Sequence, residues 1–248
     1  MTTAAPQGAR VLAQARFEVG TLLRNGEQLL VSLILPALVL IGLSLTTTPS
    51  LGPGRRIDVV APGVLALCVM SAAFTSQAIS TGFDRRYSVL RYLGVTPLGR
   101  GGLIAGKILA TFAVELIQVV VLGAIAAGLG WRPALAGLPY AVLFLAVGTG
   151  TFVSLAMLLA GTLRAEAVLA LANLIWILLL AGGGVVIPRT QFPGAASHLA
   201  AALPSAALSD GLRAALIGGR LDVLALGILV TWGVLAGLLA TRWFRWSD

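Results

Sequence analysis

The sequence predicts an all-α polytopic membrane protein: six transmembrane helices, an amphipathic interfacial helix before them, and short helices in the last outer loop. Of the 248 residues, 58% are hydrophobic and 10% charged, whereas a soluble domain carries about 25% charged residues. The mean hydropathy is +0.98, and a chain this apolar cannot cover itself with polar surface in water. We therefore expect residues 1–248 to form a single transmembrane domain.

The first element is expected at residues 9–27, as a helix along the inner membrane surface. At about 100° per residue its apolar side chains fall within an arc of roughly 120°, opposite a polar side. Its arginines are then available for lipid phosphates; a disordered tail is the alternative. Charges interrupt the segment, so no removable signal peptide is expected. The arc holds Val11, Leu12, Ala15, Val19, Leu22 and Leu23, and the polar side holds Gln14, Glu18, Thr21 and Asn25.

Six later stretches are long and apolar enough to cross a hydrocarbon core of about 30 Å, which takes about 20 residues. Proline, glycine and arginine fill the breaks between them, as in residues 48–56. The six spans are expected at residues 28–46, 59–81, 103–129, 138–161, 166–187 and 221–241.

The flanking charges predict that both termini lie in the cytoplasm. Short cytoplasmic loops carry an excess of lysine and arginine, and this orientation places 11 of the 17 basic residues inside and 6 outside. Trp243 and Trp246 then suit an interfacial anchor. The inner set is Arg10, Arg16, Arg24, Arg85, Arg86, Arg91, Arg100, Lys107, Arg164, Arg242 and Arg245; the outer set is Arg55, Arg56, Arg132, Arg189, Arg213 and Arg220.

The inner loop at residues 82–101 is expected to hold a short helix. Phe83, Tyr87 and Leu90 share one face of it, Gly94 ends it, and Pro97 prevents its continuation. Two interpretations stay open for this basic and aromatic loop: an orientation signal, or a surface that docks an acidic or grooved cytoplasmic partner. Its four arginines are Arg85, Arg86, Arg91 and Arg100.

The outer stretch at residues 188–220 is too apolar for a polar loop. Short helices that dip into the outer leaflet or cap a cavity satisfy its backbone better than irregular chain does. Apolar runs at residues 199–203 and 206–208 carry this prediction.

Glu115 is the strongest polar signal within the spans. It lies about 12 residues into the third span, and a carboxyl group near mid-membrane must be paired, protonated or hydrated. Gln118, one turn later, is a candidate hydrogen-bond partner. The pair lines a substrate path in one interpretation and locks helices together in the other. Asn173 in the fifth span is a weaker candidate, better explained by a helix–helix hydrogen bond.

Small residues spaced four apart mark close helix contacts at Gly102/Gly106, Ala124/Gly128 and Gly233/Gly237. Without large side chains the backbones approach one another, either within one chain or between two chains. Packing within the chain is the favoured interpretation.

Several chemistries are excluded or unsupported. The basic residues flank apolar spans, so the net charge of +8 does not indicate nucleic-acid binding. A single cysteine and a single histidine give no disulfide framework and no metal or catalytic site. Residues 101–108 approach a phosphate-binding loop, but Ile108 occupies the position of the magnesium-coordinating hydroxyl. Lys107 is instead expected to extend its amine to the membrane surface.

Taken in order, the motifs resemble the type-2 permease family of ATP-binding-cassette exporters, which transport drugs and lipids. The resemblance covers nearly the whole chain. It rests on Glu18 and the Arg24–Asn25 pair before the first span, Pro36 within it, the inner loop from Arg85 through Pro97 to Lys107, and the outer segment around Pro204 and residues 210–213.

The resemblance implies a bacterial plasma-membrane subunit that moves a hydrophobic or amphipathic substrate outward, as in multidrug resistance. Two such chains, copies or paralogues, would pair above two cytoplasmic ATPases that bind the ATP and magnesium, and this chain would have no ATPase site. A helix near Phe83–Leu93 would seat in the ATPase through Phe83, Arg85, Arg86, Tyr87, Leu90 and Arg91. A self-sufficient secondary transporter or channel is the alternative, although no internal repeat supports it; a membrane-embedded enzyme is the least favoured class.

Overall fold

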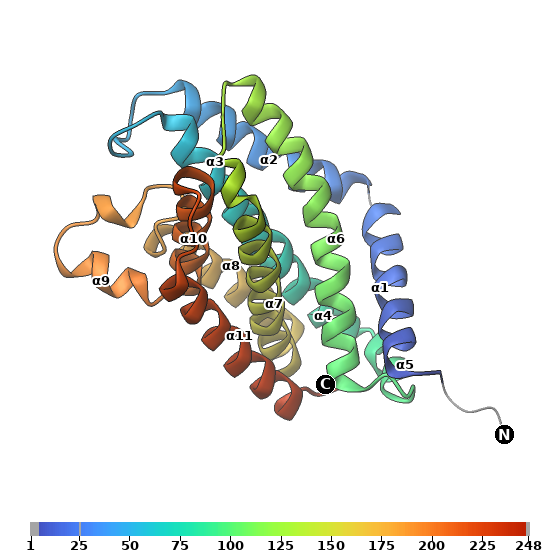
Figure 1. Ribbon diagram of the computed structural model, residues 1–248. Coiled ribbons are helices and arrows are strands. Elements are labelled where there is room, and N and C mark those ends of the chain that lie inside the picture. The colour runs from blue at the N-terminus through green and yellow to red at the C-terminus, as the bar shows by residue number, and fades with distance from the viewer. Residues whose placement is uncertain (1–4, 25, 247–248) are drawn as a thin grey trace.

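The computed structural model describes residues 5–24 and 26–246, without the side chains of residues 26–31. Asn25, paired above with Arg24, lies outside the described residues. All elements of the described part are helices, and Figure 1 shows most of them as one elongated bundle. Five helical segments are long and apolar enough to cross a membrane, and α2 (Gly26–Leu45) adds a shorter described apolar stretch, Ser32–Leu45. The predicted polytopic all-α fold is confirmed.

The second span is longer than expected. α3 (Arg56–Val69), the π-helical segment η1 (Met70–Ser76) and α4 (Gln77–Arg86) form one continuous helix of 31 residues. At 1.5 Å per residue it is about 46 Å long, so it extends beyond a hydrocarbon core of about 30 Å. Its last turns bring Phe83, Arg85 and Arg86 onto a spanning helix rather than onto a separate short one.

The remaining spans follow the predicted order, with boundaries that differ by several residues. They are α6 (Gly99–Gly128), α7 (Leu138–Thr162), α8 (Ala165–Gly182) and α11 (Val223–Trp243). The 3-10 turn η2 (Leu135–Gly137) precedes α7. We name one end of the bundle the α5 end, after α5 (Val89–Gly94), because α4 ends, α6 begins, and α7 and α11 end there. The opposite end, which holds the α6–α7 connection, is the far end.

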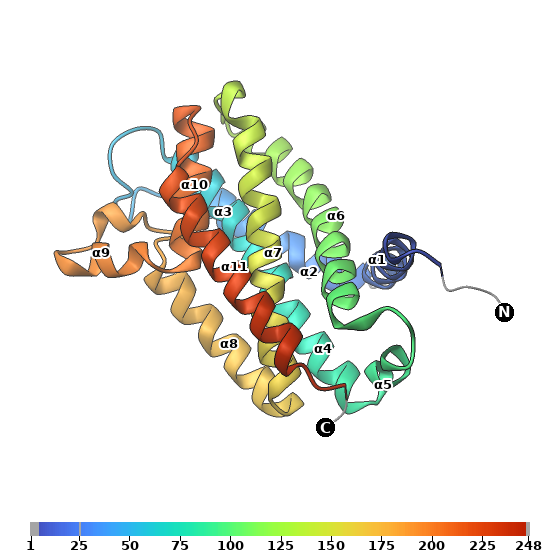
Figure 2. The same ribbon diagram turned by 60° about the horizontal axis from the view of Figure 1, so that its bottom comes forward.

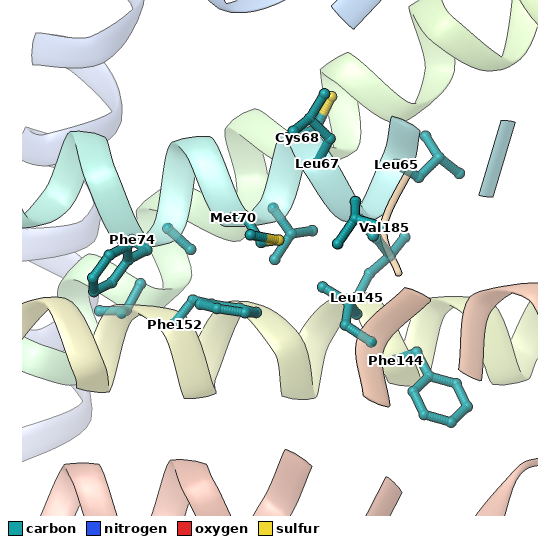
Figure 3. Packing of buried hydrophobic residues seen from close by; sticks show 14 of the residues in the cluster. Leu65, Leu67, Cys68, Met70, Phe74, Phe144, Leu145, Phe152 and Val185 are labelled. Atoms are coloured by element: carbon teal, nitrogen blue, oxygen red, sulfur yellow. The ribbon is translucent and has the colours of Figure 1, made fainter. Parts of the chain in front are cut away.

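The core lies between α3–η1 and α7. Every residue from Val60 to Met70 is buried. Figure 3 shows Met70 and Phe74 on the side of this helix that faces Leu145 and Phe152 of α7, whereas Leu67 and Cys68 point away from α7. The rings of Phe74 and Phe152 meet edge to face with centroids 6.4 Å apart. Apolar packing of this kind supplies the dispersion contacts that bind helices together in lipid, where burial from water contributes little.

The outer stretch forms the 3-10 turn η3 (Arg189–Gln191), α9 (Ala195–Ala201) and α10 (Pro204–Gly218). α9 is exposed, with Leu199 75% accessible. α10 packs instead against α3, α7 and α11, and its first residues approach the end of α8. The predicted short helices are therefore present, and the second belongs to the bundle.

The small-residue pairs divide between two roles. A Cβ on Gly106 would lie 2.7 Å from Gln14 Cγ of α1 (Gln7–Arg24), and one on Gly233 would lie 2.8 Å from Thr151 Oγ1 of α7. These two pairs serve packing within the chain, as favoured above. Gly128 has no neighbour within 4 Å of an added Cβ, so the Ala124/Gly128 pair faces away from the described chain.

Candidate functional site

The short helix of the inner loop is α5, displaced from the expected position. Ser88, with φ of 61°, adopts the left-handed conformation and breaks the helix after α4. The predicted shared face holds for Phe83 and Tyr87, whose rings stack with centroids 6.1 Å apart. It is wrong for Leu90, because the backbone break separates Leu90 from both.

The six predicted docking residues lie in unlike environments. Leu90 is 1% exposed and Arg85 4% exposed, Phe83 is half-buried, and Tyr87, Arg86 and Arg91 are exposed. Arg85 donates to the carbonyl oxygens of Ala160 and Leu163 at the end of α7. Arg86 forms an ion pair with Glu166 of α8 on the surface. Arg85 and Leu90 therefore hold the loop in place and are not available as surface contacts in this structure.

A different set of side chains is presented at the α5 end. Tyr87 is 69% exposed, Tyr92 76% and Val95 85%, beside the exposed Arg91. We define Tyr87, Arg91, Tyr92 and Val95 as the α5 surface. The sequence predicted neither Tyr92 nor Val95 as a docking residue, because their exposure depends on the helix break at Ser88.

Two parts of the chain hold the α5 surface. From α1, Gln7 Nε2 donates to the Leu98 carbonyl over 3.1 Å, and Arg10 donates to the Pro97 carbonyl. The C-terminal segment contributes Trp246, whose ring lies 3.2 Å from a Cβ built on Gly94. Trp246 therefore packs against the loop rather than serving as the predicted interfacial anchor, whereas Trp243 is 54% exposed.

α1 attaches to α6 through a buried ion pair. Lys107 is 1% exposed, and its Nζ lies 2.9 Å from Glu18 Oε1 of α1. Gln14 Nε2 donates to the same carboxylate over 3.0 Å. The expectation that Lys107 extends to the membrane surface is wrong, because α1 covers it. In the same way, part of the polar side of α1 faces the bundle, while Leu12, Phe17 and Leu23 remain exposed.

This arrangement inclines α1 to the spans. α1 is seen end-on in Figure 2, while α6 and α7 run across the same view. The close approach needs small residues on α6, and Gly102 and Gly106 provide them. α1, the start of α6 and the α5 loop therefore form one packed unit.

Glu115 is buried between two spans. It is 2% exposed, and its Oε2 contacts the hydroxyl of Thr149 on α7. Thr149 also lies 2.7 Å from the Leu145 carbonyl, to which it can donate. A threonine hydroxyl has one hydrogen, which Thr149 can donate either to Glu115 or to the Leu145 carbonyl of its own helix. The contact links α6 to α7.

Gln118 does not act as the partner of Glu115 among the described residues. Its Nε2 lies 3.1 Å from Ser32 Oγ and 3.3 Å from the Ser32 carbonyl oxygen, so it ties α6 to α2. Asn173 is exposed on α8 and donates to the Leu169 carbonyl of its own helix. The expected interhelical hydrogen bond of Asn173 is therefore not seen in the described chain, and the substrate-path role of all three residues stays a prediction.

A second buried arginine was not identified from sequence as structural. Arg213 of α10 donates to the carbonyl oxygens of Gly184 and Val185 over 2.7 and 2.6 Å, and Asp210 pairs with Arg189 and Arg213. Burial lowers the pKa of Arg213 to about 10, so the guanidinium stays charged at neutral pH. It binds carbonyl groups that the chain leaves unpaired after α8.

These features define a class of protein before any comparison is made. A bundle of long apolar helices, five of them long enough to cross a bilayer, defines a polytopic membrane protein. The chain matches the ABC-2 type transporter family over residues 10–217 and belongs to that family. The matched region is a permease membrane domain, and this domain contains no ATPase domain. A comparison with curated proteins gave no match.

The buried ion pair predicts a non-additive pair of substitutions. Lys107→Met leaves Glu18 without its cation, and breaking a buried pair costs about 3–5 kcal/mol, whereas replacing both partners by apolar residues is often neutral. We expect Lys107→Met to lower the melting temperature of the detergent-purified chain, and Lys107→Met with Glu18→Leu to recover most of the loss. If the double variant loses as much stability as the Lys107→Met and Glu18→Leu single variants added together, the two side chains are not coupled.

Glu115 gives a second prediction. Glu115→Gln keeps the shape and a hydrogen for Thr149, whereas Glu115→Ala removes the contact and leaves a cavity that costs about 1 kcal/mol or more. We expect the glutamine variant to melt within about 2 °C of the wild type and the alanine variant to melt several degrees lower. If the glutamine variant is as unstable as the alanine variant, the carboxyl group is required in its charged form.

Proposed function

We propose that this permease works as the membrane half of an exporter driven by separate ATPase subunits. Members of the family generally pair with such subunits. In this proposal ATP and magnesium are bound by the partner, and the α5 surface is where the partner docks. The single observation that carries the proposal is the exposure of Tyr87, Tyr92 and Val95 beside Arg91 on a loop held by α1 and by Trp246.

Exposed aromatic and arginine side chains favour a protein contact. Tyrosine and arginine are enriched among the residues that contribute most to binding at interfaces. A loop that is already ordered loses little conformational entropy when a partner binds. The attachments of Leu98 and Pro97 to α1, and of Gly94 to Trp246, provide that order.

The same attachments supply a route for motion. A push on α5 is transmitted to α6 through the short connection at residues 95–98, and to α7 through Arg85, which donates to the Ala160 and Leu163 carbonyls. Closure of two ATPases would then tilt α4, α6 and α7 as packed elements. We assign a hydrophobic or amphipathic substrate, a second permease chain, both termini in the cytoplasm and a bacterial plasma membrane to this proposal.

Two surface substitutions test the docking site. Arg91→Glu with Tyr92→Ala reverses one charge and removes one ring without touching the buried Arg85 or Leu90. Interface hot spots contribute about 2 kcal/mol or more each, and 1.4 kcal/mol is tenfold in affinity. We expect at least a tenfold fall in the ATPase that co-purifies with the tagged chain in mild detergent.

The matched control lies at the far end. Arg132 and Leu135 are exposed there, so Arg132→Glu with Leu135→Ala makes a similar change away from the α5 surface and is expected to retain the ATPase. Undiminished co-purification of the Arg91/Tyr92 variant would reject the docking site. Gradient-driven transport by the purified chain alone would instead support a secondary transporter.

A further inference from the structure

An arginine-lined cavity lies at the α5 end, apart from the α5 surface. Its volume is about 530 Å³, and Arg100, Arg242 and Arg245 line it together with Thr162, Trp243 and Phe244. No acidic residue is among these described lining residues. Backbone contacts shape the cavity: Arg100 Nη1 donates to the Thr241 carbonyl over 3.1 Å, and Arg245 N donates to the Gly161 carbonyl over 3.0 Å.

Two arginine side chains give this cavity positive charge that a ligand can bind. Arg242 and Arg245 are exposed, and neither takes part in an ion pair of the described chain. Arg100, by contrast, is partly satisfied by the carbonyl oxygens at the end of α11. A group that binds here carries negative charge and accepts several hydrogen bonds, as a phosphate does.

A second cavity, almost entirely apolar, borders the first. Its volume is about 320 Å³, and Thr162 lines both cavities. Phe74, Leu155, Leu159, Ile175, Leu179 and Trp232 line its walls. The hydroxyl of Thr162 donates to the Leu158 carbonyl of its own helix over 2.7 Å, so it presents no free donor to the cavity.

The second cavity runs from the end of the bundle toward its middle. From Thr162 to Leu155 along α7 is about 10 Å, and from Trp243 to Trp232 along α11 is about 16 Å. Figure 2 shows the end of α7, the start of α8 and the end of α11 together at the α5 end. The two cavities, which share Thr162, therefore place a charged surface region next to an apolar region that extends along α7 toward the middle of the bundle.

We propose that the joined cavities hold one anionic phospholipid, with its phosphate at Arg242 and Arg245 and one acyl chain along Leu155 and Leu159. Basic pockets between spans at the membrane surface bind anionic headgroups. At hydrocarbon depth no water competes for an apolar cavity, so a lipid chain fills it. The exposed Trp243 beside the arginines lies where the headgroup region is expected.

The apolar cavity decides between a lipid and a protein as the occupant. An acidic surface of a soluble partner would use the arginines alone and would leave the cavity along α7 and α8 unexplained. A phospholipid accounts for both. It would also contact α8 together with α7 and α11, which already pack against each other.

Native mass spectrometry of the detergent-purified full chain tests the site. Phosphatidylglycerol and phosphatidylcholine with the same acyl chains are titrated separately. We expect phosphatidylglycerol to bind at about tenfold lower concentration. Arg242→Gln with Arg245→Gln should remove this preference, and Arg132→Gln with Arg220→Gln, two exposed arginines remote from the cavity, should keep it.

A filling variant tests the chain cavity separately. Leu159→Trp leaves the arginines intact. It should weaken binding of long-chain phosphatidylglycerol several-fold and leave binding of the dihexanoyl form unchanged. If Leu159→Trp does not fold, Leu158→Phe is used in its place. Equal binding of the two lipids to the wild type overturns the proposal. It is also overturned if soluble glycerol phosphate competes as well as the lipid does. A third contradicting result is an Arg242/Arg245 variant that keeps its preference for phosphatidylglycerol and loses only the co-purifying ATPase.

Discussion

Inside the hydrocarbon core no water is available to a backbone amide or carbonyl, so each must find its partner within the protein. Helices meet this requirement along their length but leave up to four carbonyl groups open at each C-terminal end. In this chain two buried arginines bind carbonyl groups that lie at the end of a helix or just after it. Arg85 serves the end of α7, and Arg213 serves the turn after α8. The positions of α4 and α10 depend on these two side chains.

The same constraint shapes the polar contacts between helices. Lys107 is buried because Glu18 of α1 accompanies it, and Glu115 is buried because Thr149 of α7 meets it. Each pair joins two elements that apolar packing alone would allow to slide. α1, α5 and the start of α6 thus form a unit in which the surface that we propose for ATPase docking is fixed from behind.

The spans and their order were predictable because a run of about 20 apolar residues has few alternatives to crossing a bilayer. The function class followed from motif order, and the family match over residues 10–217 supports it. What sequence could not supply was the three-dimensional pairing. The break at Ser88 decides that Tyr92 is exposed and Leu90 buried, and periodicity through residues 83–90 gives no sign of it. Nor does spacing show that α1 covers Lys107, since the two partners are 89 residues apart.

We propose that the α5 end faces the cytoplasm and is covered there by an ATPase. The substitution Val95→Cys, in a Cys68→Ser background, tests this most directly with a membrane-impermeant maleimide in inverted membrane vesicles. We expect labelling in vesicles that lack the ATPase and protection when the ATPase is present. Leu135→Cys at the far end should be labelled only from the opposite side. Equal labelling of Val95→Cys with and without the ATPase, or labelling only from outside, would contradict it.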